Sequence, residues 1–184
     1  MQFDYYGGEA AQLAADLVNS PALWAPGELE TLLVRHGMAR GLPDAGEIDA
    51  AWEWRGRLAP CFGAQPLEQR CGVINALLDE AASRPYISLH KGPPHLHYAA
   101  ESAGRSARLR AVTATGLSYV VCFASADRLG RCQRAECAQV FVDTSRNGRR
   151  SYCSLRCANT DAVRRHRAQQ RSAAQRGAAK SRGV

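Results

Sequence analysis

Four cysteines near the C-terminus constrain this chain more than any other feature. They stand as Cys132-x4-Cys137 and Cys153-x3-Cys157, all within 26 residues. Four thiolates at two short paired spacings are typical of a tetrahedral zinc site, because the ion needs its donors gathered around one point. Such a shell has no open position, so the spacing predicts one structural Zn²⁺ and no catalytic metal. The alternative is that the four cysteines pack together without a metal.

The expected compartment supports the metal interpretation. Residues 1–5 are polar and acidic and lack the basic segment of a signal peptide. No apolar run approaches the ~18–20 residues of a membrane span, so we expect no membrane partner. A reducing cytoplasm is the predicted location, and there clustered cysteines are more often metal ligands than disulfides. We expect the other three cysteines, Cys61, Cys71 and Cys122, to be buried free thiols.

The charge is divided unevenly along the 184 residues. Residues 1–127 carry a net charge of −4, whereas residues 128–184 carry +11. The four cysteines therefore lie in the basic part, and this part is the predicted contact for a polyanion. Some of its arginines also offset the negative charge of four thiolates.

Local patterns around the cysteines predict a small finger. Residues 140–142 are typical of a strand, and residues 145–148 (Ser-Arg-Asn-Gly) of a turn, so we predict residues 149–152 as the return strand. Cys153 and Cys157 are four residues apart and share one face at the start of a helix. Loop, hairpin and ligand-bearing helix together predict a treble-clef-like finger that ends in a basic helix.

The predicted basic helix covers residues 154–171. Arg164, Arg167 and Arg171 share one of its faces, and Leu155, Ala162 and His166 share another, which we expect to pack on the hairpin. Arginine makes bidentate contacts to phosphates and to guanine edges, which favours nucleic acid over a merely solvated basic tail. The predicted nucleic-acid-binding residues are Arg149, Arg150, Arg164, Arg165, Arg167 and Arg171.

The N-terminal region is predicted to be mostly helical with a small β-hairpin. Apolar periodicity predicts helices over residues 9–19, 27–39, 46–59, 66–83 and 108–126, and two short strands over 86–90 and 95–98. The fold class is therefore α+β. We predict a domain over residues 1–127, a zinc finger over 128–171, and a frayed or disordered basic tail over 172–184.

Three histidines lie on or beside the predicted hairpin. His95 and His97 point to one face of a strand, and His90 lies close to the turn. They could bind a metal, an anion or a small acid, which makes His90, His95 and His97 candidate ligand-binding residues. The alternative is a hydrogen-bonded structural pair.

The chain resembles the ABATE-domain and CGNR zinc finger family. Residues 131–167 carry the resemblance through Phe141-Val142-Asp143-Thr144-Ser145-Arg146-Asn147 and Arg149-Arg150-x-Tyr152-Cys153, and residues 13–20 (Leu-Ala-Ala-Asp-Leu-Val-Asn-Ser) resemble an ABATE segment. The resemblance implies a bacterial stress-induced transcriptional regulator with zinc on Cys132, Cys137, Cys153 and Cys157. The motif that names the finger departs here, because Ala158 and Thr160 replace its glycine and arginine.

These observations favour a DNA-binding transcriptional regulator. Its N-terminal domain would bind a small-molecule effector or mediate homodimerisation. The second hypothesis is an RNA-binding or ribosome-associated protein. A metal-dependent enzyme is the least favoured, because no nucleophile–base motif, phosphate loop or carboxylate pair stands out, and we expect no catalytic residues.

Overall fold

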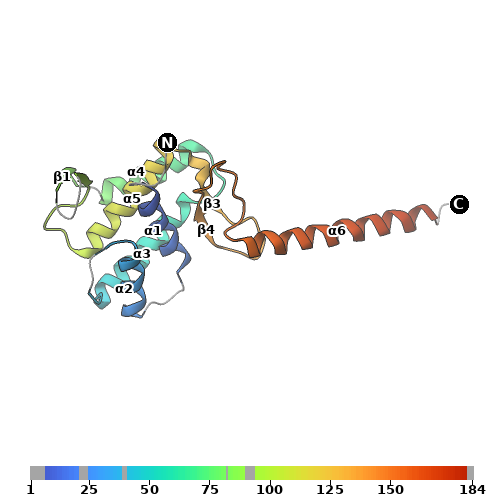
Figure 1. The fold of residues 1–184 in the computed structure, drawn as a ribbon, viewed down its shortest axis with the longest axis horizontal. Coiled ribbons are helices and arrows are strands. Elements are labelled where there is room, and N and C mark those ends of the chain that lie inside the picture. The colour runs from blue at the N-terminus through green and yellow to red at the C-terminus, as the bar shows by residue number, and fades with distance from the viewer. Residues whose placement is uncertain (1–6, 21–24, 39–40, 82, 90–93, 182–184) are drawn as a thin grey trace.

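Six α-helices and two small antiparallel hairpins make up the described part of the chain, which confirms the predicted α+β class (Figure 1). The computed structural model describes residues 7–20, 25–38, 41–81, 83–89 and 94–181. The helices are α1 (Gly7–Asn19), α2 (Pro26–Arg35), α3 (Ala45–Leu58), α4 (Leu67–Ala81), α5 (Arg105–Phe123) and α6 (Leu155–Ser181). The strands are β1 (Tyr86–Ser88), β2 (His95–His97), β3 (Leu129–Arg131) and β4 (Val140–Val142), and 3-10 turns cover Ala59–Cys61 and Ala126–Arg128.

The start of α3 shows how local chemistry sets a helix boundary. The carboxylate of Asp44 accepts a hydrogen bond from the Glu47 amide at 2.8 Å, and the Glu47 carboxylate accepts one from the Asp44 amide at 3.2 Å. This reciprocal capping box satisfies amides that have no partner inside the helix. The helix predicted over residues 46–59 is thereby confirmed, with a start one residue earlier.

Helix α5 is the centre of the N-terminal core, and α1 packs directly against it. A Cβ added at Gly116 of α5 would lie 2.5 Å from the Ala10 Cβ and 2.6 Å from the Ala11 amide nitrogen. Only glycine allows the two backbones to approach this closely. Gly116, which weakens the helical pattern of the sequence, is therefore required by the packing. Trp54 from α3 fills the other side and donates its indole N–H to the Thr113 hydroxyl at 2.8 Å.

The β3–β4 hairpin belongs to the same hydrophobic core as the helices. Leu129, Val140 and Val142 are buried together with Leu13 and Leu17 of α1. The predicted domain boundary between residues 127 and 128 therefore marks a change in composition and charge, with continuous packing across it.

Two groups of hydrogen bonds fix the finger on the body. The Asn19 side chain at the end of α1 donates to the Val140 carbonyl at 2.9 Å and accepts from the Val140 amide at 2.8 Å. The buried Arg70 guanidinium donates to the carbonyls of Cys61, Gly63 and Leu129. Asn19 thus pairs with both backbone groups of Val140 in β4 and joins α1 directly to the finger.

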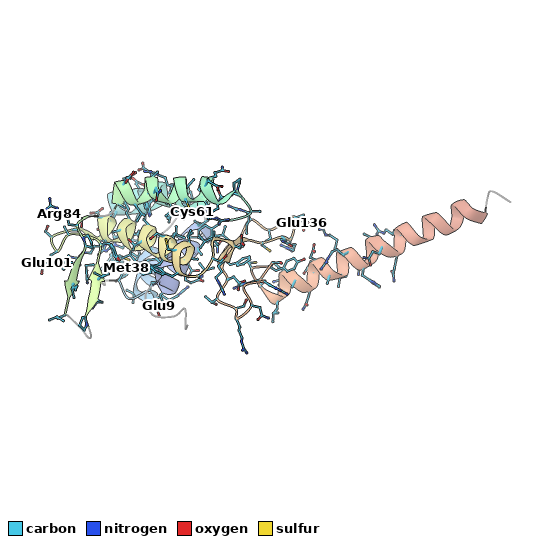
Figure 2. The ribbon with its side chains drawn as sticks, turned by 90° about the horizontal axis from the view of Figure 1, so that it is seen from above. Glu9, Met38, Cys61, Arg84, Glu101 and Glu136 are labelled. Atoms are coloured by element: carbon cyan, nitrogen blue, oxygen red, sulfur yellow. The ribbon has the colours of Figure 1, made fainter. Side chains whose placement is uncertain are left out.

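The β1–β2 hairpin and α6 lie at opposite ends of the molecule (Figure 2). In the hairpin, Tyr86 pairs with His97, Ile87 with Leu96 and Ser88 with His95. Helix α6 starts beside the β3–β4 hairpin and then projects away from the body (Figure 1).

The structure corrects two predictions. The partner of β4 is β3, ahead of the first cysteine pair, and residues 149–152 form no strand. Cys122 is exposed and Cys71 is half-buried, whereas Cys61 is buried as expected. Residues 172–181, for which a frayed helix or a disordered tail was predicted, continue α6 as a helix. Among the residues that the structure describes, no helix has the length and apolar character of a membrane span.

Candidate zinc centre and nucleic-acid interface

The first cysteine pair lies in the connection of the β3–β4 hairpin. Cys132 directly follows β3, and its amide donates to the Gln139 carbonyl at 2.9 Å, which extends the strand ladder. The Cys137 amide donates to the Arg134 carbonyl at 2.9 Å and closes a tight turn. The hairpin therefore forms a knuckle that returns both sulfurs to one side.

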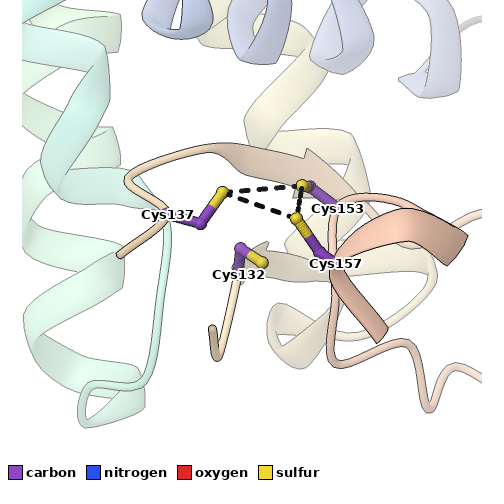
Figure 3. Close-up of side chains that lie close together, drawn as sticks. All are labelled: Cys132, Cys137, Cys153 and Cys157. Carbon is purple, nitrogen blue, oxygen red and sulfur yellow. Dashed lines mark hydrogen bonds between the residues drawn. The ribbon is translucent and has the colours of Figure 1, made fainter. Parts of the chain in front are cut away.

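The second pair lies at the start of α6 and meets the knuckle (Figure 3). The Cys137 sulfur is 3.7 Å from the Cys153 sulfur and 3.9 Å from the Cys157 sulfur, and Cys153 and Cys157 are 3.5 Å apart. The sulfur of Cys132 completes the group, and the four atoms all lie within 4.8 Å of one another.

These distances fit a zinc tetrathiolate. A tetrahedron with Zn–S bonds of about 2.3 Å separates its sulfurs by about 3.8 Å. A disulfide needs about 2.05 Å, far shorter than any of the three measured separations. The donor set is entirely thiolate and closed, so the four cysteines form a structural Zn²⁺ site, and the predicted cofactor is confirmed.

A buried carboxylate in α6 fixes the helix beside the zinc site. Asp161 is 4% exposed and accepts a hydrogen bond from the Tyr152 hydroxyl at 2.8 Å. The Tyr152 hydroxyl and then the Arg164 and Arg165 guanidiniums lower the pKa of Asp161. Asp161 is one turn beyond Cys157, so metal and carboxylate hold the same helix face. The Tyr152–Asp161 pair was not predicted from the sequence. The one sign of it was a single acidic residue within an arginine-rich helix.

A second buried carboxylate shapes the loop between β4 and the cysteines. Asp143 accepts hydrogen bonds from the Ser145 and Arg150 amides, both at 2.8 Å. Burial raises its pKa, but these hydrogen bonds outweigh burial, and the net pKa is lowered. The Arg128 guanidinium also donates to the Asp143 and Ser145 carbonyls. The loop is therefore held in a defined shape, which orients the chain that enters the second cysteine pair.

Arg150 has a structural role in the finger. Its guanidinium lies 4.7 Å over the Phe141 ring and donates to the carbonyls of Tyr152 and Cys153. A Cβ on Gly130, the strand partner of Phe141, would lie 2.4 Å from that ring, so glycine makes room for it. The Phe141 ring thus contacts both Gly130 and the Arg150 guanidinium. Arg150 was predicted to bind nucleic acid; it is exposed, and its Nε and one terminal nitrogen donate within the protein.

The other predicted nucleic-acid-binding arginines all lie on the surface. Arg164 and Arg165 pair with Asp161 at 2.9 and 3.1 Å, yet their side chains stay 60% and 62% exposed. Arg149, Arg167 and Arg171 are exposed. Further arginines of the finger, among them Arg146 in the loop and Arg156 on α6, are also exposed.

The predicted packing of α6 on the hairpin was wrong. Leu155 is 83% exposed, and Ala162 and His166 are exposed too. The buried face carries Cys157 and Asp161 instead, because the metal and a hydrogen bond attach this helix where apolar contacts do not. From Ala162 to Arg171, all the side chains of α6 are exposed and open to a partner.

The positions that depart from the finger motif lie on this helix. Ala158 is half-buried next to the zinc site, where alanine suits a helix better than glycine. Thr160 is exposed, and its hydroxyl donates to the Arg156 carbonyl one turn earlier. An arginine at position 160 would stand on the open face, so this chain presents one cation fewer there.

The histidines of the N-terminal region form a hydrogen-bonded pair. The Nε2 atoms of His95 and His97 are 3.0 Å apart, and the His97 ring stacks on Tyr86 with centroids 5.2 Å apart. His90 lies outside the described residues. Among the described residues, the four cysteines are the one group of three or more side chains that is placed to bind a metal ion. The geometry therefore favours the structural interpretation of His95 and His97.

One comparison with known proteins gives a family. Residues 128–170 match the family model of the CGNR zinc finger. This match covers the knuckle, the loop and the first part of α6, and it confirms the resemblance of residues 131–167 to the CGNR zinc finger. A search of curated proteins finds no match to the chain.

Proposed function

We propose that this chain is a DNA-binding transcriptional regulator that binds duplex DNA through α6. It carries a CGNR zinc finger over residues 128–170. The observation that supports it is a long arginine-bearing helix, projecting into solvent and anchored at one end by zinc. At 27 residues, α6 spans about 40 Å. An α-helix of this kind fits the major groove of B-DNA.

The charges of the finger favour a polyanion. Residues 128–184 contain three acidic residues, and two of them, Asp143 and Asp161, are buried and bonded within the protein. The outward surface is therefore almost purely cationic. Each phosphate contact by arginine or lysine adds affinity through the release of counterions, and this affinity falls with salt.

The Asp161 ion pairs are compatible with DNA contact. The carboxylate is buried, but the Arg164 and Arg165 side chains are 60% and 62% exposed. Their remaining N–H donors can therefore contact a phosphate while the pairs with Asp161 persist. Arg149, Arg167 and Arg171 are the first choice for phosphate contacts, because they are exposed and their guanidiniums are not used in the zinc loop.

The body of the protein completes the proposal. A single small finger offers about 600–1,000 Å² of DNA interface, so specific binding calls for a homodimer. The N-terminal helical domain would supply the dimer contact or bind an effector. We propose no enzymatic role. Stress would be the condition under which the regulator changes its activity. RNA is the alternative partner, but α6 has no Phe, Tyr or Trp on which bases could stack.

Arginine substitutions test the proposal. Arg149→Ala, Arg167→Ala and Arg171→Ala should each weaken binding to a random-sequence duplex and reduce the slope of log affinity against log salt by about one. Alanine preserves the helix, so the loss would report the lost contact. The measurement is fluorescence anisotropy of labelled DNA and RNA across a salt series.

Arg84→Ala is the matched control, because Arg84 is exposed at the far end of the molecule (Figure 2). Its affinity and salt slope should equal those of the unsubstituted protein. If all four variants behave alike, α6 is not the nucleic-acid surface. A clear preference for RNA over duplex DNA would replace the proposal by the RNA-binding alternative.

A further inference from the structure

A cavity of about 480 Å³ opens at the end of the molecule that is far from the finger. It lies between α1, α5 and the β1–β2 hairpin. Helix α5 lines it with Val112, Thr115, Gly116 and Tyr119, which follow one another at helical spacing on one face. The volume falls in the range of small-molecule sites, about 300–1,000 Å³.

The side chains at the solvent-exposed mouth of this cavity are apolar. Ile87 and Leu96 face each other across the hairpin and both line the cavity, yet they are 69% and 45% exposed. Val112 adds a third partly exposed aliphatic side chain. No lysine, arginine, aspartate or glutamate lines the cavity in the described part of the chain. The lining therefore favours a neutral molecule with an apolar body.

A buried hydroxyl lines the cavity and lacks a hydrogen-bond partner. Thr115 is 7% exposed, and its Oγ1 has no partner among the residues that the structure describes. Thr113, two residues earlier on α5, donates back to the Leu109 carbonyl at 2.8 Å, as helical threonines commonly do. Thr115 makes no such bond, although an unsatisfied buried hydroxyl is unfavourable. A ligand oxygen in the cavity would satisfy it.

Two tyrosine hydroxyls stand beside this threonine. The Tyr98 and Tyr119 hydroxyls are 3.0 Å apart, and Tyr119 is one turn from Thr115 on α5. Only one of the two hydrogens lies between the oxygens, so the other remains available to an acceptor. Burial, and then the hydrogen bond with Tyr119, raises the pKa of Tyr98 to about 12, which keeps its hydroxyl neutral.

We infer that this cavity is a binding site for a small neutral ring compound that carries one carbonyl oxygen. The ring would lie against Ile87, Leu96 and Val112, and the oxygen would accept hydrogen bonds from Thr115 and the tyrosine pair. His95 also lines the cavity, and its Nε2 is hydrogen-bonded to the Nε2 of His97 at 3.0 Å, so the proposed contacts to the oxygen come from the hydroxyls.

Helix α1 connects this cavity to the finger. Ala10 lines the cavity, and Asn19 at the other end of the same helix is hydrogen-bonded to β4. Because α1 is in tight contact with α5 at Gly116, a ligand that widens the cavity must move α1 as a body. On the proposed DNA-binding function, the ligand would therefore change DNA affinity through Asn19.

A matched pair of probes tests the site without DNA. 2-Acetylnaphthalene and 2-ethylnaphthalene have nearly the same shape, and only the first carries a carbonyl. Titration of the zinc-loaded full chain, followed by ligand-observed NMR, should show both bound and the acetyl compound bound more tightly. Thr115→Val should weaken the acetyl compound about fivefold, as expected for one hydrogen bond, and leave the ethyl compound unchanged.

A blocking variant separates this site from other apolar surfaces. Val112→Trp fills the mouth of the cavity from a partly exposed position and should abolish binding of both probes while the circular dichroism spectrum stays native. Binding that survives Val112→Trp, no binding of either probe, or equal loss of both probes in Thr115→Val would overturn the inference. None of these results depends on DNA, so the site can stand if DNA binding fails.

Discussion

Removal of zinc is expected to melt α6 while the β3–β4 hairpin stays attached to the body. Among residues 155–171 the buried side chains are Cys157 and Asp161, so the metal is the main anchor of the helix. Zinc binding at such sites is worth about 10–16 kcal/mol in apparent terms, which no single hydrogen bond replaces. Leu129, Val140 and Val142 are buried against α1 without help from the metal. Chelation under reducing conditions should therefore lower the helical circular dichroism signal, and hydrogen exchange should locate the loss in α6.

Two serine variants provide the control for zinc removal. Cys157→Ser should reproduce the effect of chelation, whereas Cys122→Ser, at an exposed cysteine outside the site, should leave the spectrum and the exchange pattern unchanged. Adding zinc back should restore the helix in the native protein and in Cys122→Ser. Full protection of α6 after metal removal would contradict a structural role for zinc.

Trp54→Ala should destabilise the zinc-loaded protein by about 3–5 kcal/mol, the usual cost of removing a large aromatic from a core. Trp54 is 1% exposed, and the Arg57 and Arg110 guanidiniums each lie 5.5 Å from its ring centroid. Its loss also removes the indole donor to Thr113. Urea unfolding followed by circular dichroism measures the change in free energy of unfolding.

Trp52→Ala is the matched control, two residues away on α3. Trp52 is half-buried and covered by the Arg55 guanidinium at 4.4 Å. Its substitution should cost clearly less than that of Trp54. Because β3 and β4 share the core with α1, both variants should unfold the body and the hairpin in one transition. Equal losses at the two tryptophans would show that the packing of α3 is described wrongly.

The zinc ligands and the helices were predictable from the sequence for a physical reason. Cysteine spacing reports directly on tetrahedral geometry, and apolar periodicity reports directly on a buried helix face. The end of α1 at Asn19 follows from local chemistry in the same way, because Pro21 in the sequence cannot continue a helix. None of these features depends on which distant segments meet.

Features that depend on long-range pairing were not predictable. The segment Leu129–Arg131 is short and interrupted by glycine, which is unfavourable in strands, so its pairing with β4 gave no sequence signal. Gly130 is there because the Phe141 ring covers it. The Asn19 contact with Val140 and the burial of Asp161 are likewise visible only once the fold brings these groups together. The exposure of Leu155 on α6 was not predictable either. Zinc and the Asp161 carboxylate attach this helix, in place of the apolar packing that Leu155 suggested.

Hydrogen exchange of the zinc-loaded protein, with and without a random-sequence DNA duplex at low salt, tests the central claim most directly. The account predicts that DNA slows exchange in residues 155–171 and in the loop around Arg149, and leaves the β1–β2 hairpin unchanged. Protection confined to the N-terminal helices, or no protection in α6 under conditions where the duplex is bound, would contradict the claim that zinc holds this helix for DNA.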